Sequence, residues 1–520
     1  MEWAKAPASR RQLTTLPHCF DDDIPADHEV RLVDLVLGQL DWKPWEAAYK
    51  REIGRPPIHP RVLAGILLYG MLRKLKSSRA LEAALRERLD FRWLAEGRSI
   101  DHSTIAEFAI KHHEQLRAIF TSTVRVAIDL GWTQLEMLAF DGTRISASNH
   151  RSRTRTPEEL RELDRRLGER FEQLRQEGEA ADRRWSANEE ACRTRQQNDI
   201  QKKRQAIAAA LKRLEELKEE GAATPARLPL TDLDARVMPN KHGGCAPNYT
   251  PLATVDVATG LMVAADVIAS TEEDKELVPA ILGVRATFGD QAGSIALADG
   301  LMATGANLER CEQEKIDLYA PTGLERREDD PTRREDPRQP VPTDRHDRLP
   351  TERRGRTGRQ LSKLAFVYDA AADCYWCPQG KALTYRQTTK EKKGKGFRVR
   401  RRYRSNQQDC AGCVLKALCL QGRSGERGIS RESHEDRREA QAAKMSTPTG
   451  RERYAKRRHA GERPFAMIKE EFGARRFRTR GREKVRQAWT WLATAFNLTI
   501  LMRRMRGTTG PPQRVSIATS

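Results

Sequence analysis

The stretch LEMLAFDGTRISAS, residues 135–148, has the composition of a buried β-strand, with Leu, Phe and Ile on either side of a turn. Asp141 lies in these apolar surroundings, directly before Gly142. Burying an unpaired carboxylate is unfavourable, so an aspartate in such a position usually has a cationic partner or binds a metal ion. The alternative is an aspartate that only closes the turn. Both interpretations predict a strand, and residues much later in the chain decide between them.

The composition of the chain indicates a polyanionic partner. The 520 residues, enough for roughly three domains, carry a formal net charge of +21, and 32% of them are charged. Such a basic balance is typical of nucleic-acid binding; an anionic membrane or plain solubility is the alternative. No run of about 18 apolar residues could span a membrane, and the start MEWAK lacks the apolar segment of a secretory signal. We therefore expect a soluble, cytoplasmic, nucleoid-associated protein.

Residues 30–125 are predicted to form a helical domain. The apolar residues 61–75 follow the proline-rich stretch PPIHP, which prevents a helix from starting earlier. Residues 101–108 (DHSTIAEF) have the signature of an N-capped helix. Short helices joined by tight turns favour a helix-turn-helix DNA-binding domain. The alternative is a helical bundle used for packing or dimerisation.

The next region alternates between strand and helix patterns. Residues 151–222 are highly charged and carry apolar residues at steps of three and four, which predicts an inserted antiparallel helical hairpin. Two apolar runs in residues 249–268 flank Gly260 and predict a β-hairpin. A further strand, residues 294–298, ends at Asp299. We therefore expect the sheet that begins at residue 135 to continue after the helical insertion.

Two stretches after residue 321 have unusual compositions. Residues 322–362 are rich in Arg, Asp and Pro, and they are predicted to be a disordered loop because they cannot bury enough apolar surface to fold. Residues 392–404 (KKGKGFRVRRRYR) interleave aromatic rings with positive charge, which suits phosphate contact and base stacking. Lys395 and Arg398 are the candidates for DNA contact here. A solvated basic loop is the alternative.

Five of the nine cysteines are clustered, as C-x2-C followed by C-x2-C-x5-C. Thiols of an intracellular protein stay reduced, so this clustering predicts a metal site rather than disulfides. Four thiolates around one tetrahedral ion favour Zn²⁺ over an iron–sulfur cluster. The alternative is a set of free thiols in a small core. The spacing leaves open whether Cys374 or Cys377 is the fourth ligand beside Cys410, Cys413 and Cys419.

The last basic segment, residues 451–486, has 14 Lys or Arg residues against five Asp or Glu residues. If it is helical, Arg458, Glu462, Phe465 and Lys469 share one face. Phe465 should then anchor that face and turn Glu462 towards the core. The alternative is an ordinary Arg–Glu pair at the surface. An apolar closing helix rich in Trp, Leu and Phe is predicted to follow.

In this order, the motifs resemble those of the DDE transposases of bacterial insertion sequences, in the branch with a cysteine-bearing insert. The resemblance extends from about residue 30 to residue 505. The motifs that carry it are GRPPIHPRVLAGILLYG, SSRALEAAL, DHSTIAEF, FDGTRISA, YTPLATVDVATGLMVAADV, ALADG, YDAAADCYWCPQGKAL, CAGCVLKALC, RYAKRRHAGERPFAMIKEEFGARRFRTRG and WLATAFNL. Each is modest alone, but their order and spacing are specific.

The resemblance implies an α/β fold with an RNase H-like mixed sheet flanked by helices. An N-terminal all-α, helix-turn-helix-like domain precedes this core, and the helical and cysteine-rich insertions interrupt it. The family's catalytic carboxylates fall on Asp141, Asp299 and Glu462. Three carboxylates of this kind can hold two Mg²⁺ or Mn²⁺ ions for phosphodiester cleavage and joining.

The resemblance also implies contacts with double-stranded DNA, both the terminal inverted repeats of the element and its target. The basic residues of the terminal signature fall on Arg458 and Lys469, which are expected to contact DNA together with Arg457. A homodimer or larger assembly on DNA is expected. At the cysteine cluster the resemblance favours Cys377 as the fourth Zn²⁺ ligand, with Cys374 as the alternative.

The predicted organisation follows from these motifs. It runs as an N-terminal tail (1–29), a helical DNA-binding domain (30–125), the first part of the core (130–150), the charged helical hairpin (151–230), the core continued (231–321), a disordered loop (322–362), the cysteine-rich insert (363–430), the last part of the core (431–506) and a tail (507–520). The chain departs from the family pattern at four positions that are not ligands: Ala109, Leu252, Met302 and Gly461.

The predicted function is that of a transposase that binds terminal inverted repeats and catalyses metal-dependent strand cleavage and strand transfer. One alternative is a catalytically inactive, transposase-derived DNA-binding repressor. Another is an RNase H-like DNA nuclease. Asp256 and Asp266, on the predicted hairpin, are rivals for the metal role and rank below the three named carboxylates.

Overall fold

The chain forms a mixed α/β structure that divides into two compact units. The computed structural model describes residues 19, 21–47, 57–149, 153–180, 187–219, 225–240, 243–326, 329–354, 358–393, 396–420 and 425–508. The first unit comprises residues 1–134, 142–271 and 462–520, and the second comprises residues 135–141 and 272–461. Each unit is therefore assembled from segments that lie far apart in the sequence.

The first unit begins with a group of helices whose starts follow ordinary capping rules. They are α1 (Glu29–Gly38), α2 (Lys43–Glu46), α3 (Pro60–Leu72), α4 (Ser78–Glu87), α5 (Leu89–Leu94), α6 (His102–Lys111) and α7 (His113–Asp129). The His59 side chain accepts a hydrogen bond from the amide of Arg61 at the start of α3, where Pro60 is the first helical residue. Asp101 caps α6 by accepting from the Thr104 amide (2.8 Å). The start signals in the sequence therefore decide where α3 and α6 begin.

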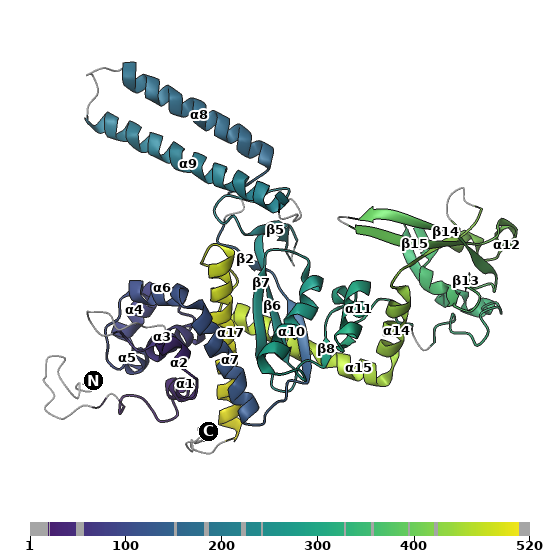
Figure 1. Ribbon diagram of the computed structural model, residues 1–520, viewed down its shortest axis with the longest axis horizontal. Coiled ribbons are helices and arrows are strands. Elements are labelled where there is room, and N and C mark those ends of the chain that lie inside the picture. Colours follow the sequence, from purple (N-terminus) through teal and green to yellow (C-terminus); the bar gives the residue numbers. More distant parts are fainter. Residues whose placement is uncertain are drawn as a thin grey trace, which may run out of the picture. The chain divides into compact units, whose positions relative to one another are not determined.

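The last helix, α17 (Arg482–Thr508), forms the core of the first unit together with α7. These two helices run side by side in Figure 1. Asn497, fully buried on α17, donates to the Thr123 hydroxyl (2.9 Å) and the Met262 carbonyl (2.8 Å) and accepts from the Met262 amide (2.8 Å). Trp491 donates to the carbonyl of Ala109 (3.0 Å). One helix thus ties together the N-terminal helices and the hairpin strands of this unit.

The charged segment after residue 150 folds as two long helices, α8 (Pro157–Ala180) and α9 (Ala187–Glu219), which run side by side as a hairpin (Figure 1). Arg204 on α9 pairs with Asp164 on α8 (2.9 Å). A narrow apolar seam closes the base of the hairpin and includes Leu160, Ile207, Ala210, Leu214 and Leu228. No helix in the described part of the chain is both long enough and apolar enough to cross a membrane.

The strands of the first unit are antiparallel and include the hairpin predicted from residues 249–268. They are β2 (Ile145–Ser146), β3 (Thr154–Arg155), β4 (Leu228–Pro229), β5 (Arg236–Pro239), β6 (Cys245–Asp256) and β7 (Met262–Ile268). β6 pairs with β7 from Thr250↔Ile268 onwards, and it also pairs with β2 and β5. Gly260 turns the hairpin with a φ of 79°, a value that glycine adopts without strain.

The sheet of the second unit is parallel and is accompanied by helices. β1 (Met137–Gly142), β8 (Ile295–Leu297) and β9 (Asp317–Tyr319) pair in the order β1-β8-β9. The helices of this part of the unit are α10 (Leu277–Phe288), α11 (Gly305–Gln313), α14 (Glu435–Ser446), α15 (Pro448–Ala455) and α16 (Arg457–Ala466), with short turns η2 (Glu273–Glu276) and η3 (Gly300–Met302). Gln441 on α14 donates to the carbonyls of Leu318 (2.9 Å) and Ala320 (3.1 Å), which fixes this helix against β9.

The cysteine-rich module, defined here as residues 329–432, also belongs to the second unit. Its strands β12 (Val367–Asp369), β13 (Cys374–Trp376), β14 (Ala382–Lys393), β15 (Gly396–Arg404) and β16 (Gly428–Glu432) form an antiparallel sheet in sequence order. Its other elements are η4 (Thr343–Arg348), β10 (Thr351–Arg354), β11 (Gly358–Leu361), η5 (Lys363–Ala365), α12 (Gln407–Ala411) and α13 (Lys416–Cys419). A small core of its own makes the module compact.

The segment 322–362 corrects the prediction of a disordered loop. In its described part β10 pairs with β11, and Val341, Leu349 and Leu361 are buried in the core of the cysteine-rich module. Arg334 donates to the backbone carbonyls of Cys377 and Pro378, at 3.2 Å each. The few apolar residues and the arginine–carbonyl contacts order this segment against its neighbour. Such contacts depend on a partner surface that the composition of the segment does not reveal.

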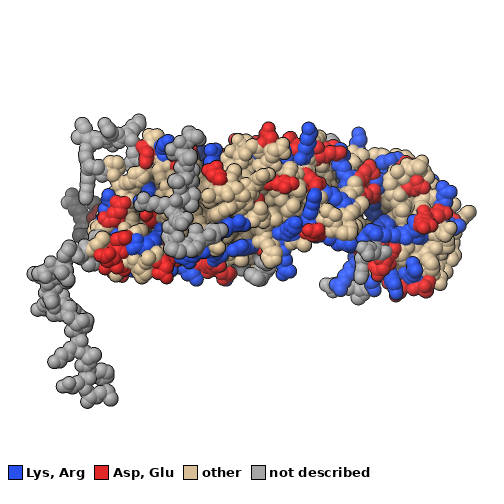
Figure 2. All heavy atoms as spheres, turned by 90° about the horizontal axis from the view of Figure 1, so that it is seen from below, with Lys and Arg blue, Asp and Glu red and all other residues tan. Residues whose placement is uncertain are grey.

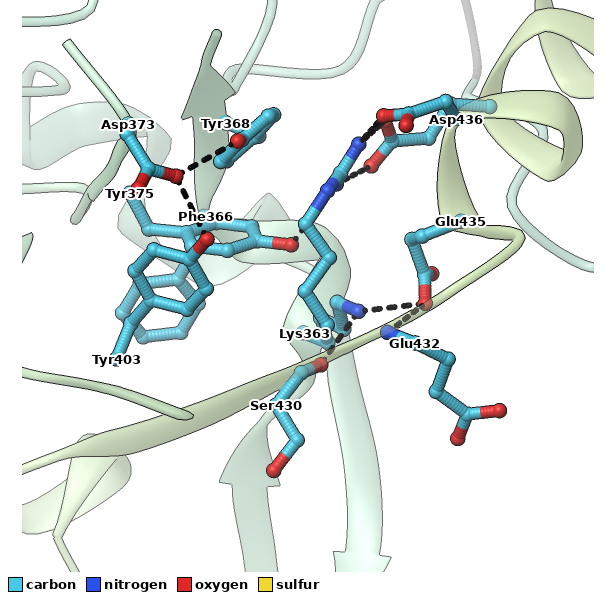
Figure 3. A network of polar contacts seen from close by, with 12 residues as sticks. Lys363, Phe366, Tyr368, Asp373, Tyr375, Tyr403, Ser430, Glu432, Glu435 and Asp436 are labelled. Atoms are coloured by element: carbon cyan, nitrogen blue, oxygen red, sulfur yellow. Dashed lines mark hydrogen bonds and ion pairs between the residues drawn. The ribbon is translucent and has the colours of Figure 1, made fainter. Parts of the chain in front are cut away.

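A buried network of polar side chains joins the cysteine-rich module to α14 (Figure 3). Arg431 on β16 is only 5% exposed and donates to both carboxylate oxygens of Glu439 (2.8 Å each) and to the Tyr375 hydroxyl (3.1 Å). Lys363 pairs with Glu435 at 3.0 Å. Burial lowers the pKa of Lys363, while the Glu435 carboxylate acts in the opposite direction. Three ion pairs therefore hold α14 to the module, two from the buried Arg431 to Glu439 and Asp436 and one from Lys363 to the buried Glu435.

Replacing Arg431 by Met should loosen this junction. The variant leaves Glu439 without its bidentate partner, and we expect the local opening free energy of β16 and α14 to fall by about 2–3 kcal/mol. Hydrogen–deuterium exchange of the amides in β16 and α14 measures this loss. The control is Arg437→Met, which breaks an ion pair with Glu312 between more exposed side chains and should change the opening free energy by less than about 0.5 kcal/mol. Equal protection in the two variants would contradict the assignment.

Candidate active site

The strands β1 and β8 bring two carboxylates to one edge of the parallel sheet. Ala139 pairs with Leu297 in the register of these strands. Asp141 and Asp299 each follow two residues later, so both leave the sheet at the carboxyl ends of neighbouring parallel strands. This edge of an open α/β sheet is where ligands usually bind.

The local sequence explains how each aspartate is held. The three residues before Asp141 are at most 1% exposed, whereas the Asp141 side chain itself keeps 16% exposure. Asp299 caps the turn η3, because its Oδ1 atom accepts a hydrogen bond from the Leu301 amide (2.8 Å). A Cβ atom at Gly300 would lie 2.9 Å from the Pro321 carbonyl oxygen, so the residue after Asp299 must be glycine. Each carboxylate is thus anchored by its own strand end and remains partly open to solvent.

The helix α16 approaches Asp141 closely. Its first residue, Arg457, places Nη2 3.2 Å from Asp141 Oδ2, and the two side chains are 15% and 16% exposed. A Cβ atom added at Gly461 would lie 3.2 Å from the same Oδ2 atom. Glycine at this departure from the family pattern therefore allows the helix backbone to pass beside the carboxylate. Arg457 is predicted from the sequence to contact DNA, and in this structure it pairs with Asp141.

Tyr454, near the end of α15, interacts with Arg457 and was not among the residues predicted from the sequence. Burial raises the pKa of its hydroxyl, the Arg457 guanidinium lowers it, and the carboxylates of Asp299 and Asp141 raise it further. The charges of both aspartates therefore reach the same hydroxyl. Residues three positions apart on a helix are neighbours, so the spacing of Tyr454 and Arg457 could have predicted their contact.

The other residues predicted on this segment have different surroundings. Phe465 is 7% exposed and stacks on Trp489 (6.0 Å between ring centroids), as an anchor of the helix should. Glu462 and Arg458, however, have exposed side chains, so the prediction that Glu462 turns towards the core was wrong. The reason is that the buried stripe of α16 runs through positions 460, 461, 464 and 465 and leaves Glu462 outside it. Lys469, in the π-turn η6 (Met467–Glu471), donates to the Thr143 hydroxyl.

The carboxylate oxygens of the two aspartates are suitable ligands for a hard divalent cation. Carboxylate oxygens are the ligands that Mg²⁺ and Mn²⁺ prefer, and the guanidinium against Asp141 shows that a cation is already accommodated at this carboxylate. Among the residues that the structure describes, no group of three or more His, Cys, Asp or Glu side chains is close enough to hold a metal ion. The two aspartates are therefore candidate metal ligands by their chemistry, and the described residues do not form a complete metal site around them.

The four cysteines that the family resemblance favours line one small cavity of the cysteine-rich module. Cys377, Cys410, Cys413 and Cys419 surround a space of about 30 Å³, whereas Cys374 lies on β13 and does not line it. Burial raises the pKa of Cys377, and the thiols of Cys413 and Cys410 add to this effect. Burial likewise raises the pKa of Cys419 to about 12. The donor set and its convergence suit Zn²⁺, although the sulfur atoms do not meet the spacing of a formed metal site.

The remaining candidates for DNA contact lie on the hairpin of β14 and β15. Arg398 pairs with Glu391 in the register of these strands, and Lys395 lies outside the described residues. Further along β15, Arg401 lies 4.9 Å from the ring of Tyr385, which is 42% exposed. The described part of this hairpin thus presents both positive charge and an accessible aromatic ring.

The two rival carboxylates of the first unit have structural partners. Asp256 is 1% exposed and closes the β6–β7 turn, since its Oδ2 atom accepts from the amide (2.9 Å) and hydroxyl (2.5 Å) of Thr259. Asp266 pairs with Arg486 on α17 at 2.6 Å. Asp266 is thus paired with an arginine, and Asp256 is held through Oδ2, while its Oδ1 atom is buried without a hydrogen-bond partner among the described residues.

Comparison with protein families connects this geometry to a known group. A model described as a transposase DDE domain matches residues 376–502, and a model described as a transposase domain matches residues 18–111. These matches support membership of the DDE-type insertion-sequence transposases. No curated protein and no solved structure matches the chain.

Only part of the candidate site lies within the matched ranges. The DDE domain match contains Glu462, Arg457 and the cysteines that line the small cavity, but Asp141 and Asp299 precede it. Both aspartates therefore rest on the motifs FDGTRISA and ALADG and on the pairing of β1 with β8. The matched families indicate a transposase.

Proposed function

We propose that this transposase binds the terminal inverted repeats of its element and catalyses metal-dependent strand cleavage and strand transfer. The observation that carries the proposal is the position of Asp141 and Asp299 at the ends of β1 and β8, two neighbouring parallel strands. Glu462, one residue after Gly461 on α16, is the proposed third carboxylate. An RNase H-like sheet combines an antiparallel hairpin with parallel strands, and β6–β7 and β1-β8-β9 are elements of these two kinds.

In the proposed mechanism Asp141, Asp299 and Glu462 hold two Mg²⁺ or Mn²⁺ ions, which when bound activate the attacking oxygen and stabilise the leaving oxygen of an in-line displacement. The protein keeps the two strand ends rigid, so the aspartates meet the scissile phosphate in a fixed geometry. Tyr454 stays protonated because burial raises its pKa, and its hydroxyl can donate a hydrogen bond into the site. Attack by water cuts a strand, and attack by the freed 3′-hydroxyl joins it to target DNA.

Double-stranded DNA is the proposed partner of several surfaces. Arg458 and Lys469 would contact phosphates near the carboxylates, and Arg398 and Lys395 would do so on the β14–β15 hairpin. The N-terminal helices would read the inverted repeats in the manner of a helix-turn-helix domain. On the face drawn in Figure 2, Lys and Arg side chains are interspersed with Asp and Glu, so local arginines rather than one large basic field should guide DNA. The protein is proposed to assemble on DNA as a homodimer or larger assembly. Its proposed location is the cytoplasm, at the nucleoid.

Zn²⁺ is the proposed ligand of the four cysteines that line the cavity of the cysteine-rich module. Its role there is structural, because thiolates on α12, on α13 and beside β13 would be joined through one ion. The ion would therefore stabilise the base of the basic hairpin without taking part in the chemistry on DNA.

The deciding experiment uses a labelled duplex that carries the end of the element, with Mg²⁺ or Mn²⁺. We expect cleavage at the element end, followed by transfer of the 3′-hydroxyl to a target plasmid. Specific binding without cleavage would favour the transposase-derived repressor. Cleavage without joined product would favour a nuclease of the RNase H-like kind.

Gly461 offers a separate test of the carboxylate geometry. Replacing Gly461 by Ala should favour the helix by about 1 kcal/mol, yet the new Cβ must displace the Asp141 carboxylate by a few tenths of an ångström. We expect cleavage of the labelled duplex to fall by about tenfold, because misplaced catalytic groups lose rate steeply. The control is Gly168→Ala on α8, where the new atom makes an ordinary contact at 3.5 Å and cleavage should not change. Equal cleavage by the two variants would mean that Asp141 is not held as described.

A further inference from the structure

The ion pair between Arg457 and Asp141 raises a question that the proposed catalysis leaves open. The guanidinium lies 3.2 Å from the carboxylate in a region where both side chains are about five-sixths buried. Arginine does not lose its proton, so this positive charge cannot be neutralised in place. A divalent cation bound at Asp141 would therefore lie within a few ångströms of a fixed like charge, where screening by water is incomplete.

Arg457 contacts both Asp141 and the Tyr454 hydroxyl, but part of its guanidinium is unsatisfied. Its Nε atom is buried without a hydrogen-bond partner among the described residues. Its planar group of donors suits a phosphate, which can accept two parallel hydrogen bonds from one guanidinium. Arg457 begins α16, next to Lys456, whose charge is exposed and paired with Glu452 (3.7 Å). A short movement of one side chain would therefore carry the guanidinium from Asp141 towards a bound phosphodiester.

We propose that Arg457 is a positioning residue that neutralises Asp141 while no DNA is bound and moves to a DNA phosphate when the duplex arrives. Metal binding at Asp141 is thereby coupled to DNA binding, and the coupling is reciprocal, since each ligand must raise the affinity for the other. The inference rests on the proposed function, because it assumes that Asp141 is a metal ligand. Its consequence is that Asp141 binds a metal ion weakly until DNA is bound.

The test measures Mn²⁺ binding to the full chain by the electron paramagnetic resonance signal of free Mn²⁺, first without DNA. We expect Arg457→Gln to bind Mn²⁺ about tenfold more tightly than the wild type, the effect of removing one charge-assisted contact. Arg457→Lys keeps the charge and should stay close to the wild type. Lys456→Gln removes the same charge one residue away, outside the site, and should also leave the affinity unchanged.

The second arm repeats the titration with a saturating element-end duplex. The wild type should then gain about tenfold in Mn²⁺ affinity, whereas Arg457→Gln should gain little, because its inhibiting charge is already absent. Binding of Mn²⁺ by the duplex itself is the same in both samples and cancels in the comparison. Unchanged affinity of Arg457→Gln without DNA, or an equal gain with DNA in both proteins, would overturn the inference.

Asp141→Asn separates this inference from the function on which it rests. If Asp141→Asn weakens Mn²⁺ binding while Arg457→Gln leaves it unchanged, the metal site stands and Arg457 is only a structural tether. If Asp141→Asn binds Mn²⁺ as tightly as the wild type, the proposed metal site itself is wrong, and the role of Arg457 falls with it. Circular dichroism of each variant shows whether it has folded, and Arg457→Lys tests the side chain without loss of charge.

Discussion

Replacing Asp141 or Asp299 by Asn, or Glu462 by Gln, is expected to reduce cleavage of an element-end duplex by about 10³-fold or more. Each substitution keeps the shape of the side chain and removes the negative charge that would hold a metal ion at the reacting phosphate. DNA binding should persist, because the residues proposed to contact phosphates are unchanged. Cleavage under single-turnover conditions and binding by fluorescence anisotropy separate the two effects.

The matched control is Asp266→Asn. This residue is a carboxylate on the predicted hairpin that rivals the three for the metal role, but it pairs with Arg486 and its side chain is 48% exposed. Its substitution should change cleavage by less than about twofold and stability only slightly. The assignment would fail if Asp266→Asn abolished cleavage while Asp299→Asn retained it. Loss of both would instead place the metal at a site that includes the hairpin.

The elements with a strong local pattern could be predicted from the sequence. The strand around Asp141 and the hairpin of residues 249–268 form because short apolar runs end at Gly142 and Gly260, which turn the chain. The start of α6 follows from the N-cap Asp101. These signals lie within a few residues of the element that they decide. The pairing of Ala139 with Leu297 joins residues more than 150 positions apart, and only the motif ALADG suggested it.

The details of the candidate site could not be predicted, because they depend on contacts between distant segments. Several other arginines lie close to Arg457 in the sequence. Only the packing of α16 against β1 makes Arg457 the partner of Asp141. The exposure of Glu462 depends on which stripe of α16 is buried, and the anchor Phe465 alone does not decide that. From the sequence, Gly461 is only a departure from the family pattern. In the structure, the Asp141 carboxylate occupies the space that a side chain at this position would need.

Replacing Cys413 by Ser should remove bound Zn²⁺ from the cysteine-rich module and unfold its base. Cys413 lines the cavity together with Cys377, Cys410 and Cys419, and a structural Zn²⁺ ion contributes on the order of 10 kcal/mol to the folding of a small domain. We expect the zinc content to fall from about one ion per chain to none, and the amides of β14 and β15 to lose protection in hydrogen–deuterium exchange. Elemental analysis of the purified protein measures the zinc directly.

Cys374→Ser is the informative control, because Cys374 belongs to the same motif but does not line the cavity. This variant should keep its zinc and lose only the modest stability that a buried thiol provides. If Cys374→Ser loses zinc and Cys377→Ser keeps it, the ligand set is the alternative one that the sequence left open. If zinc content is unchanged in every cysteine variant, the raised pKa values of Cys377 and Cys419 describe free thiols in a small core. The module would then be held by its apolar residues and by the Arg431 network, and the loss of stability in Arg431→Met would exceed that in Cys413→Ser.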